Sequence, residues 1–231
     1  MKNYGILSTL PPATKHLLII NILCWFAIIT FSHTNINLIN EGGLHFILAD
    51  KFNPTQFITY MFLHDSRTLT HLLFNMFALF MFGRVLENTW GTKRFLTYYI
   101  ITGLGAAIVQ QVIWYIQLQD LLASPAQTVN MMGTLIDKAT YLNMHITIGA
   151  SGAIFGILLA FGVTFPNSQL YLFFIPYPIK AKYFITVYAI IELSIGIYNP
   201  SSGIAHFAHL GGMLFGLIII LIWKNNAKKQ R

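Results

Sequence analysis

The stretch that decides the fold is IGASGAIFGILLAFGVTF, residues 148–165, which carries no charged side chain. A helix that crosses a bilayer needs about 20 mostly apolar residues, so this stretch predicts a membrane-spanning helix. Five further stretches of the same kind lie before and after it. We therefore predict an all-α membrane protein, a single domain built as a bundle of six transmembrane helices, at residues 14–33, 69–87, 95–116, 148–165, 182–198 and 204–223.

The composition supports the same class. Apolar residues make up 55% of the chain and charged residues only 9%, with a mean hydropathy of +0.62, so we predict the lipid bilayer as its surroundings. The net charge of +7 falls in short clusters without interleaved aromatic residues, which argues against a nucleic-acid partner. The single cysteine, Cys24, lies in an apolar run, so neither a disulfide framework nor a thiolate metal site is expected.

The distribution of Lys and Arg predicts the orientation. With both termini in the cytoplasm, including the basic tail at residues 224–231, eleven of the fourteen basic residues lie on the cytoplasmic side, as the positive-inside rule requires. Only Lys51, Arg67 and Lys138 lie outside. We therefore predict a multi-pass protein of the cell (inner) membrane, with extracytoplasmic loops at residues 33–67 and 117–147.

Polar side chains gather near the extracytoplasmic ends of three predicted helices. A polar group in a spanning helix is costly unless it faces protein or water, so each is a candidate functional residue. His71 and Asn75 lie near the start of the second helix, and Ser151 near the start of the fourth. His206 and His209 lie near the start of the sixth. Polar residues gathered at one depth are typical of a functional site, whereas a transporter or channel would have polar residues through the full depth of the membrane.

Ser151 lies at the start of the fourth helix, in the sequence Gly149-Ala150-Ser151-Gly152. Free backbone N–H groups at a helix start stabilise a developing oxyanion, although a serine there is more often a cap or packing residue. The α/β-hydrolase elbow G-x-S-x-G is excluded because Ala153 stands at its last position.

His209 supplies the base that a serine nucleophile needs. Small residues on the two helices allow their backbones to approach, which would bring His209 to Ser151: Gly152 and Gly156 on the fourth helix, Gly212 and Gly216 on the sixth. Phe155, one turn after Ser151, either stacks on the imidazole or simply packs in the core.

His71 and Asn75 lie four residues apart on one helix face. They either donate hydrogen bonds to an oxyanion or connect two helices. A third catalytic residue is not evident, because Glu192, which lies about mid-helix, is expected to pair with another helix and not to orient His209.

In these residues the chain resembles a bacterial rhomboid protease, from about Phe52 to Gly216. The matching elements are His71-x-x-x-Asn75, the run from Gly149 to Gly156, and Ala208-His209-Leu210-Gly211-Gly212 with Gly216, while the series Gly83, Glu87, Gly91 and Phe95 also matches and would be structural.

The resemblance implies an intramembrane serine endopeptidase with a Ser-His dyad. Ser151 would be the nucleophile, His209 the general base and then acid, and His71, Asn75 and the Ser151 amide the oxyanion hole. The implied partners are transmembrane protein substrates, and neither a cofactor nor a metal is expected; H-E-x-x-H, the metalloprotease motif, does not occur. The alternative is a catalytically inactive rhomboid-like binding protein, which would be expected to lack Ser151 or His209.

Two features depart from the family pattern. The first external loop lacks the Trp-Arg pair of some members and contains no Trp at all, so its anchoring must differ. The loop at residues 117–147 is long, and the sequence does not indicate its role.

Overall fold

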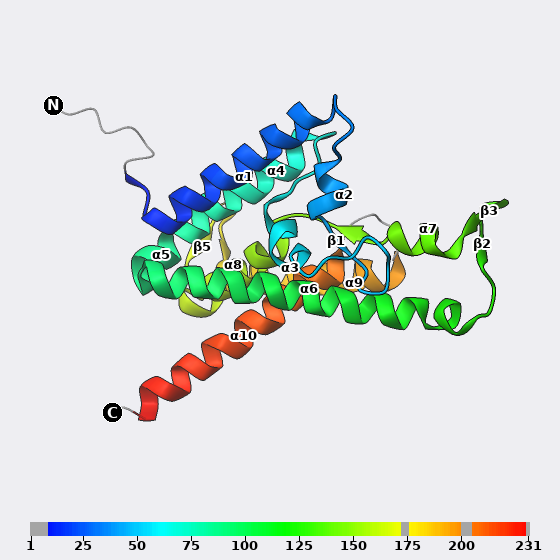
Figure 1. Ribbon diagram of the computed structural model, residues 1–231. Coiled ribbons are helices and arrows are strands. Elements are labelled where there is room, and N and C mark those ends of the chain that lie inside the picture. The colour runs from blue at the N-terminus through cyan, green and yellow to red at the C-terminus, as the bar shows by residue number, and fades with distance from the viewer. Residues whose placement is uncertain (1–8, 172–175, 200–204, 230–231) are drawn as a thin grey trace.

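The computed structural model describes residues 9–171, 176–199 and 205–229 (Figure 1). Its long helices are α1 Pro12–Phe31, α4 Leu69–Ala78 continued by the π-helical turn η3 Leu79–Gly83 and by α5 Arg84–Trp90, α6 Thr92–Ala123, α8 Ser151–Thr164, α9 Ala181–Tyr198 and α10 His206–Lys229. The short elements are α2 Leu38–Gly42, β1 Leu44–His45, α3 Gln56–Thr59, η2 Tyr60–Phe62, β2 Thr128–Met131, β3 Thr134–Asp137, α7 Lys138–Asn143, β4 Ile146–Thr147, β5 Gln169–Leu170 and β6 Ile179–Lys180.

Each of the six predicted segments contains one of these long helices or runs of helix, and the all-α membrane class is confirmed. Within the described ranges, five helices are long and apolar enough to cross a membrane. The fourth segment is shorter than predicted, because α8 begins only at Ser151 and its 14 residues span about 21 Å. Conversely, α6 continues to Ala123 and α10 to Lys229. The predicted first residue of the last helix, residue 204, lies outside the described residues.

The two ends of the bundle differ in their connections. In Figure 1 the start of α1, the turn at α5 and the end of α10 lie at the left, whereas α7 and the hairpin of β2 and β3 lie at the right. At this second end the strand β1 pairs antiparallel with β4, with Leu44 opposite Thr147 and His45 opposite Ile146. This pairing holds the segment that leads into α8.

α6 lies at the centre of the packing and contacts both α8 and α10. Three of its aromatic side chains, Phe95, Tyr98 and Tyr99, are fully buried. The Tyr98 hydroxyl donates to the Gly156 carbonyl of α8 at 2.8 Å, so the phenol both fills the core and satisfies its polar group.

The buried carboxylate of Glu87 holds together the end of the bundle that lies opposite the β1–β4 pairing. Glu87 of α5 accepts the Ala13 and Thr14 N–H groups at 2.8 and 2.7 Å and the Thr92 hydroxyl at 2.7 Å. Glu87 therefore caps α1 and connects α1 to α6. These contacts agree with the structural role expected for Glu87 from the sequence.

The glycines bring α8 and α10 together, as predicted, but their contacts differ in part. A side chain at Gly212 would collide with the Gly152 carbonyl, so these backbones touch directly. Gly156 and Gly216 instead face α6, where a Cβ atom would meet Thr102 and Tyr98, respectively. The glycine faces therefore pack the two helices onto α6 as well as onto each other.

Candidate active site

Ser151 is the first residue of α8, and its position depends on the backbone before it. Gly149 has a φ of +128°, a conformation that L side chains rarely adopt, and its N–H donates to the Tyr60 carbonyl at 2.9 Å. The chain thus turns sharply into the helix, which begins at the half-buried Ser151 with N–H groups that have no acceptor within the helix.

His209 meets Ser151 across the α8–α10 contact. Its Nε2 atom lies 2.8 Å from Ser151 Oγ, a hydrogen-bond distance, and the side chain is almost fully buried, at 8% exposed. The ring stacks on Phe155 with centroids 4.1 Å apart and planes 6° apart. Of the two interpretations of Phe155, the geometry agrees with contact to the imidazole.

Glu192 of α9 pairs with another helix, as expected. Its Oε2 atom lies 2.9 Å from His209 Nδ1 and 2.7 Å from His206 Nδ1. The sequence did not predict that the contact with α10 includes His209. The carboxylate, His209 and Ser151 form one line of contacts, with His206 beside it.

His71, on the first turn of α4, faces the same region. A Cβ atom built on Gly149 would lie 3.0 Å from His71 Nε2 and 3.5 Å from Ser151 Oγ, so only a glycine leaves this space open. The other ring nitrogen, Nδ1, lies 3.4 Å from the Asp65 N–H. An N–H group approaching Nδ1 favours the tautomer with hydrogen on Nε2, which then points towards the space at Gly149.

Asn75 is buried one turn further along α4, with 6% of its surface exposed. Its Nδ2 atom donates to the His71 carbonyl at 2.8 Å. An amide NH₂ carries two hydrogens, so one donor remains beyond this intrahelical bond. The recorded bond lies within α4 and does not connect two helices.

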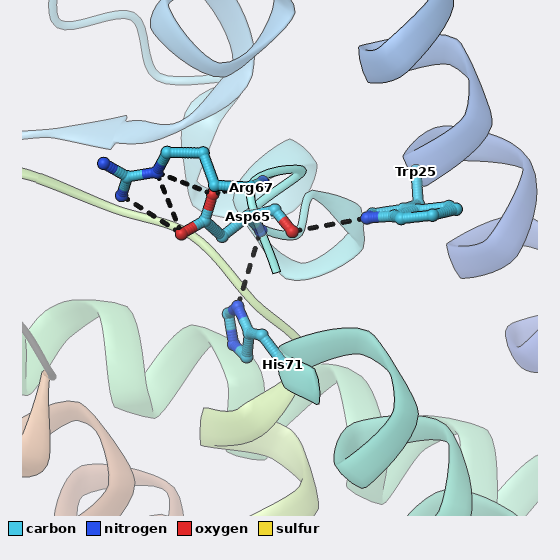
Figure 2. Close-up of polar contacts among 4 residues, drawn as sticks. All are labelled: Trp25, Asp65, Arg67 and His71. Carbon is cyan, nitrogen blue, oxygen red and sulfur yellow. Dashed lines mark hydrogen bonds and ion pairs between the residues drawn. The ribbon is translucent and has the colours of Figure 1, made fainter. Parts of the chain in front are cut away.

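A polar cluster that we did not predict lies beside His71. Figure 2 shows Asp65 at the centre of this cluster, with Trp25 on one side, Arg67 on the other and His71 below. Trp25 Nε1 of α1 donates to the Asp65 carbonyl at 3.3 Å, and the Arg67 guanidinium binds both carboxylate oxygens of Asp65 at 3.0–3.2 Å. The hydrogen bonds from Arg67 hold the pKa of the Asp65 carboxyl below its usual range.

Through this cluster the segment before α4 contacts α1, although the loop at residues 33–67 contains no Trp of its own. The tryptophan comes from the preceding helix α1, not from the loop. Trp25 and Asp65 are forty residues apart in the chain, so no local sequence pattern predicts their contact.

Among the described residues, one group has the composition of a metal site: Glu192, His206 and His209, whose candidate ligand atoms lie within 4.8 Å of one another. Both histidine Nδ1 atoms contact the same carboxylate oxygen at 2.7 and 2.9 Å, whereas two ligands of one tetrahedral zinc ion, each about 2.1 Å from the metal, would lie roughly 3.4 Å apart. These contacts are hydrogen-bond distances.

Comparison with known proteins matches residues 51–226 to the family model described as the rhomboid domain. This range covers well over half of the chain and includes Ser151, His209 and Glu192. The chain belongs to the rhomboid family. Its membership agrees with the helical membrane architecture, and with the placement of the polar residues at one end of the helices.

Relatives within the rhomboid family include a protease and several proteins from eukaryotes. Rhomboid protease AarA of Providencia stuartii is 31% identical over 91% of this chain and 72% of its own length. RHOMBOID-like protein 4 of Arabidopsis thaliana and the mitochondrial Rhomboid protein 1 of Saccharomyces cerevisiae are each 26% identical, over 65% and 70% of this chain. The chain spans only 30% and 40% of those two proteins' lengths.

Proposed function

We propose that this protein is an intramembrane serine endopeptidase that cleaves transmembrane protein substrates. The observation that carries the proposal is the 2.8 Å contact between Ser151 Oγ and His209 Nε2 at the start of α8, in a chain of the rhomboid family. A serine becomes a competent nucleophile when a neighbouring imidazole takes its proton. The similarity to a rhomboid protease supports the same conclusion.

The reaction is acyl transfer to water. His209 Nε2 takes the hydroxyl proton as Ser151 Oγ attacks the peptide carbonyl carbon, and the oxygen becomes negative beside the helix start, His71 and Asn75. His209 then gives the proton to the departing amine nitrogen, leaving an acyl ester on Ser151. A water molecule, deprotonated by His209, attacks the ester and releases the serine.

The substrate is expected to be a transmembrane helix that unwinds near its extracytoplasmic end after entering beside α4 and α9. A backbone in hydrocarbon cannot lose its internal hydrogen bonds without a large cost, so substrates with Gly or Pro near that end should be preferred. The assignment of the site to the extracytoplasmic end rests on the excess of Lys and Arg on the opposite side, with both termini in the cytoplasm.

Replacement of the nucleophile tests the proposal. Ser151→Ala should abolish cleavage of a model transmembrane substrate while the protein stays folded and inserted, because the only proposed nucleophilic atom is removed. The matched control is Ser194→Ala: this hydroxyl of α9 donates to the Ile190 carbonyl and should not matter for turnover. Residual cleavage by Ser151→Ala above a few per cent would refute the proposed nucleophile.

Chemical labelling tests the class of enzyme independently. A fluorophosphonate should modify the detergent-solubilised protein at Ser151, and metal chelators should leave cleavage unchanged. Inhibition by a chelator, with recovery on addition of zinc, would instead assign the cluster of Glu192, His206 and His209 to a metal-dependent reaction. Absence of both labelling and cleavage would favour the inactive, substrate-binding alternative.

A further inference from the structure

Glu192 is a buried acid on a loosely packed helix. Only 22% of the spanning window of α9 is buried, compared with 50% for both α6 and α10, yet Glu192 itself is 5% exposed. A carboxylate within a membrane helix is costly and normally has a partner or a function. Here its partners are His206 and His209, both on α10.

We propose that Glu192 is a positioning residue for His209, so that the site works as a Glu-His-Ser relay and not as a dyad. This inference rests on the proposed function. Glu192 Oε2 and Ser151 Oγ lie on opposite sides of the imidazole, 2.9 Å from Nδ1 and 2.8 Å from Nε2. The carboxylate does not touch the reacting atoms and acts only through His209.

The carboxylate selects the tautomer of His209. An ionised carboxylate accepts hydrogen bonds and donates none, so the His209 nitrogen facing Glu192 must carry its hydrogen. Neutral His209 then has its lone pair on Nε2, where it accepts the hydrogen bond from the Ser151 hydroxyl. This is the tautomer that a general base requires.

The same carboxylate also faces the charge that develops during the reaction. When His209 takes the serine proton, an imidazolium forms 2.9 Å from Glu192 Oε2, inside a buried cluster where water screens charges poorly. The negative carboxylate stabilises this ion pair. Glu192 therefore contributes to the transition state as well as to the geometry of the resting site.

His206 holds the carboxylate in place. Its Nδ1 atom lies 2.7 Å from the same oxygen, and its ring stands nearly perpendicular to that of His209, at 83°. Two imidazoles on successive turns of α10 thus converge on one oxygen of α9. This arrangement limits rotation of the Glu192 side chain and keeps it directed at His209.

Isosteric replacement tests the relay. In Glu192→Gln the side chain keeps its size but loses its charge, and its amide offers donors to Nδ1 as well as one acceptor. We expect turnover to fall by up to roughly 10⁴-fold, the loss known when the acid of a serine triad becomes an amide, with KM little changed. Glu192→Met, which removes the polar group from a membrane helix, should fold and lose at least as much turnover.

A spectroscopic measurement separates positioning from structure. Nitrogen-15 spectra of the histidine-labelled protein, assigned by the signals that His209→Gln removes, should show His209 protonated at Nδ1 in the unaltered protein. In Glu192→Gln and Glu192→Met the two tautomers should mix. Glu87→Gln is the matched control, because it also neutralises a buried carboxylate but one that binds the start of α1 and Thr92; it should lower the melting temperature without changing the His209 signals.

Two outcomes would overturn the inference. The first is turnover within about threefold of normal in folded Glu192→Gln or Glu192→Met; the second is an unchanged His209 spectrum in both. Either result, together with inactive Ser151→Ala, would leave a Ser-His dyad and the proposed function intact. Cleavage by Ser151→Ala would instead remove the proposed function, and the spectra would still report whether Glu192 sets the tautomer.

Discussion

The imidazole of His209 lies flat against the ring of Phe155, with centroids 4.1 Å apart and planes 6° apart. Phe155 is buried on α8, one turn after Ser151. Its ring also packs on that of Tyr188 of α9, with centroids 4.9 Å apart. The aromatic ring therefore joins the helix of the nucleophile to that of the base. It restricts rotation of the imidazole while the two nitrogens face Ser151 and Glu192.

Phe155→Leu should lower turnover about 3- to 10-fold with little change in KM. An aromatic pair contributes about 0.5–1.5 kcal/mol beyond its buried area, and about 1.4 kcal/mol corresponds to tenfold in rate. Phe161→Leu is the control, since Phe161 is buried on the same helix but packs on Phe82. Both variants should lose stability; equal losses of turnover would show that the Phe155 ring only fills the core.

The two histidines of α10 should differ strongly in importance. His209→Ala should abolish cleavage, because Nε2 of His209 is the imidazole atom recorded beside Ser151 Oγ. His206→Ala should be far milder, since His206 contacts Glu192 and acts on the serine only through it. The measurement is turnover of a model substrate at matched amounts of folded enzyme. The opposite order would transfer the role of base to His206.

The sequence predicts the helices and the meeting of Ser151 and His209 because these follow from periodicity, apolar length and glycine faces, whereas it left the contact of Phe155 with the imidazole as one of two alternatives. The short α8 was overestimated: residues 148–150 are apolar, but they form the turn at Gly149 and not the helix. Irregular backbone of this kind is tolerated where protein buries it.

The contact between Glu192 and His209 was not predicted because a sequence does not give the relative heights of two neighbouring helices. Glu192 lies six residues before the end of α9, about 9 Å along the axis, and His209 lies three residues after the start of α10, about 4.5 Å. The long glutamate side chain and the packing of α9 on α10 close that difference. Trp25 and Asp65 meet for the same reason, through tertiary packing that has no local pattern.

Acid should destabilise the protein in part through His64, which is fully buried in the segment before α4. Burial, together with the nearby His71, lowers the pKa of His64 to about 4, whereas an unfolded histidine has a pKa of about 6.5. The unfolded state therefore binds more protons between these values. The stability that neutral His64 contributes is complete above about pH 6.5 and is lost as the pH falls towards 4.

The variant His64→Phe keeps a ring without a titrating group. Its melting temperature should fall less between pH 7 and pH 4.5 than that of the unaltered protein, by an amount that reflects at most roughly 3 kcal/mol of linkage. If His64→Phe and the unaltered protein lose stability in parallel, protonation of His64 is not a source of acid sensitivity.

The oxyanion hole can be tested at Asn75, where the structure leaves one amide hydrogen beyond the bond to the His71 carbonyl. If that donor reaches the developing oxyanion, Asn75→Ala should lower turnover about 10- to 1000-fold, since losing such a donor costs about 1.4–4 kcal/mol of transition-state stabilisation. Substrate binding should change little. His71→Ala should give a similar or smaller loss, because the Ser151 amide and Asn75 would remain.

Asn21→Ala provides a closely matched control for Asn75→Ala. Asn21 of α1 is also buried, and its Nδ2 atom likewise donates to the carbonyl four residues earlier, that of Leu17, at 2.7 Å. Removing it should cost stability with normal turnover in the protein that stays folded. Melting temperature and turnover measured on the same preparations then distinguish the two roles. If Asn75→Ala and His71→Ala behave like Asn21→Ala, destabilised but fully active, neither side chain belongs to the oxyanion hole, and the N–H groups at the start of α8 must stabilise the oxyanion without them.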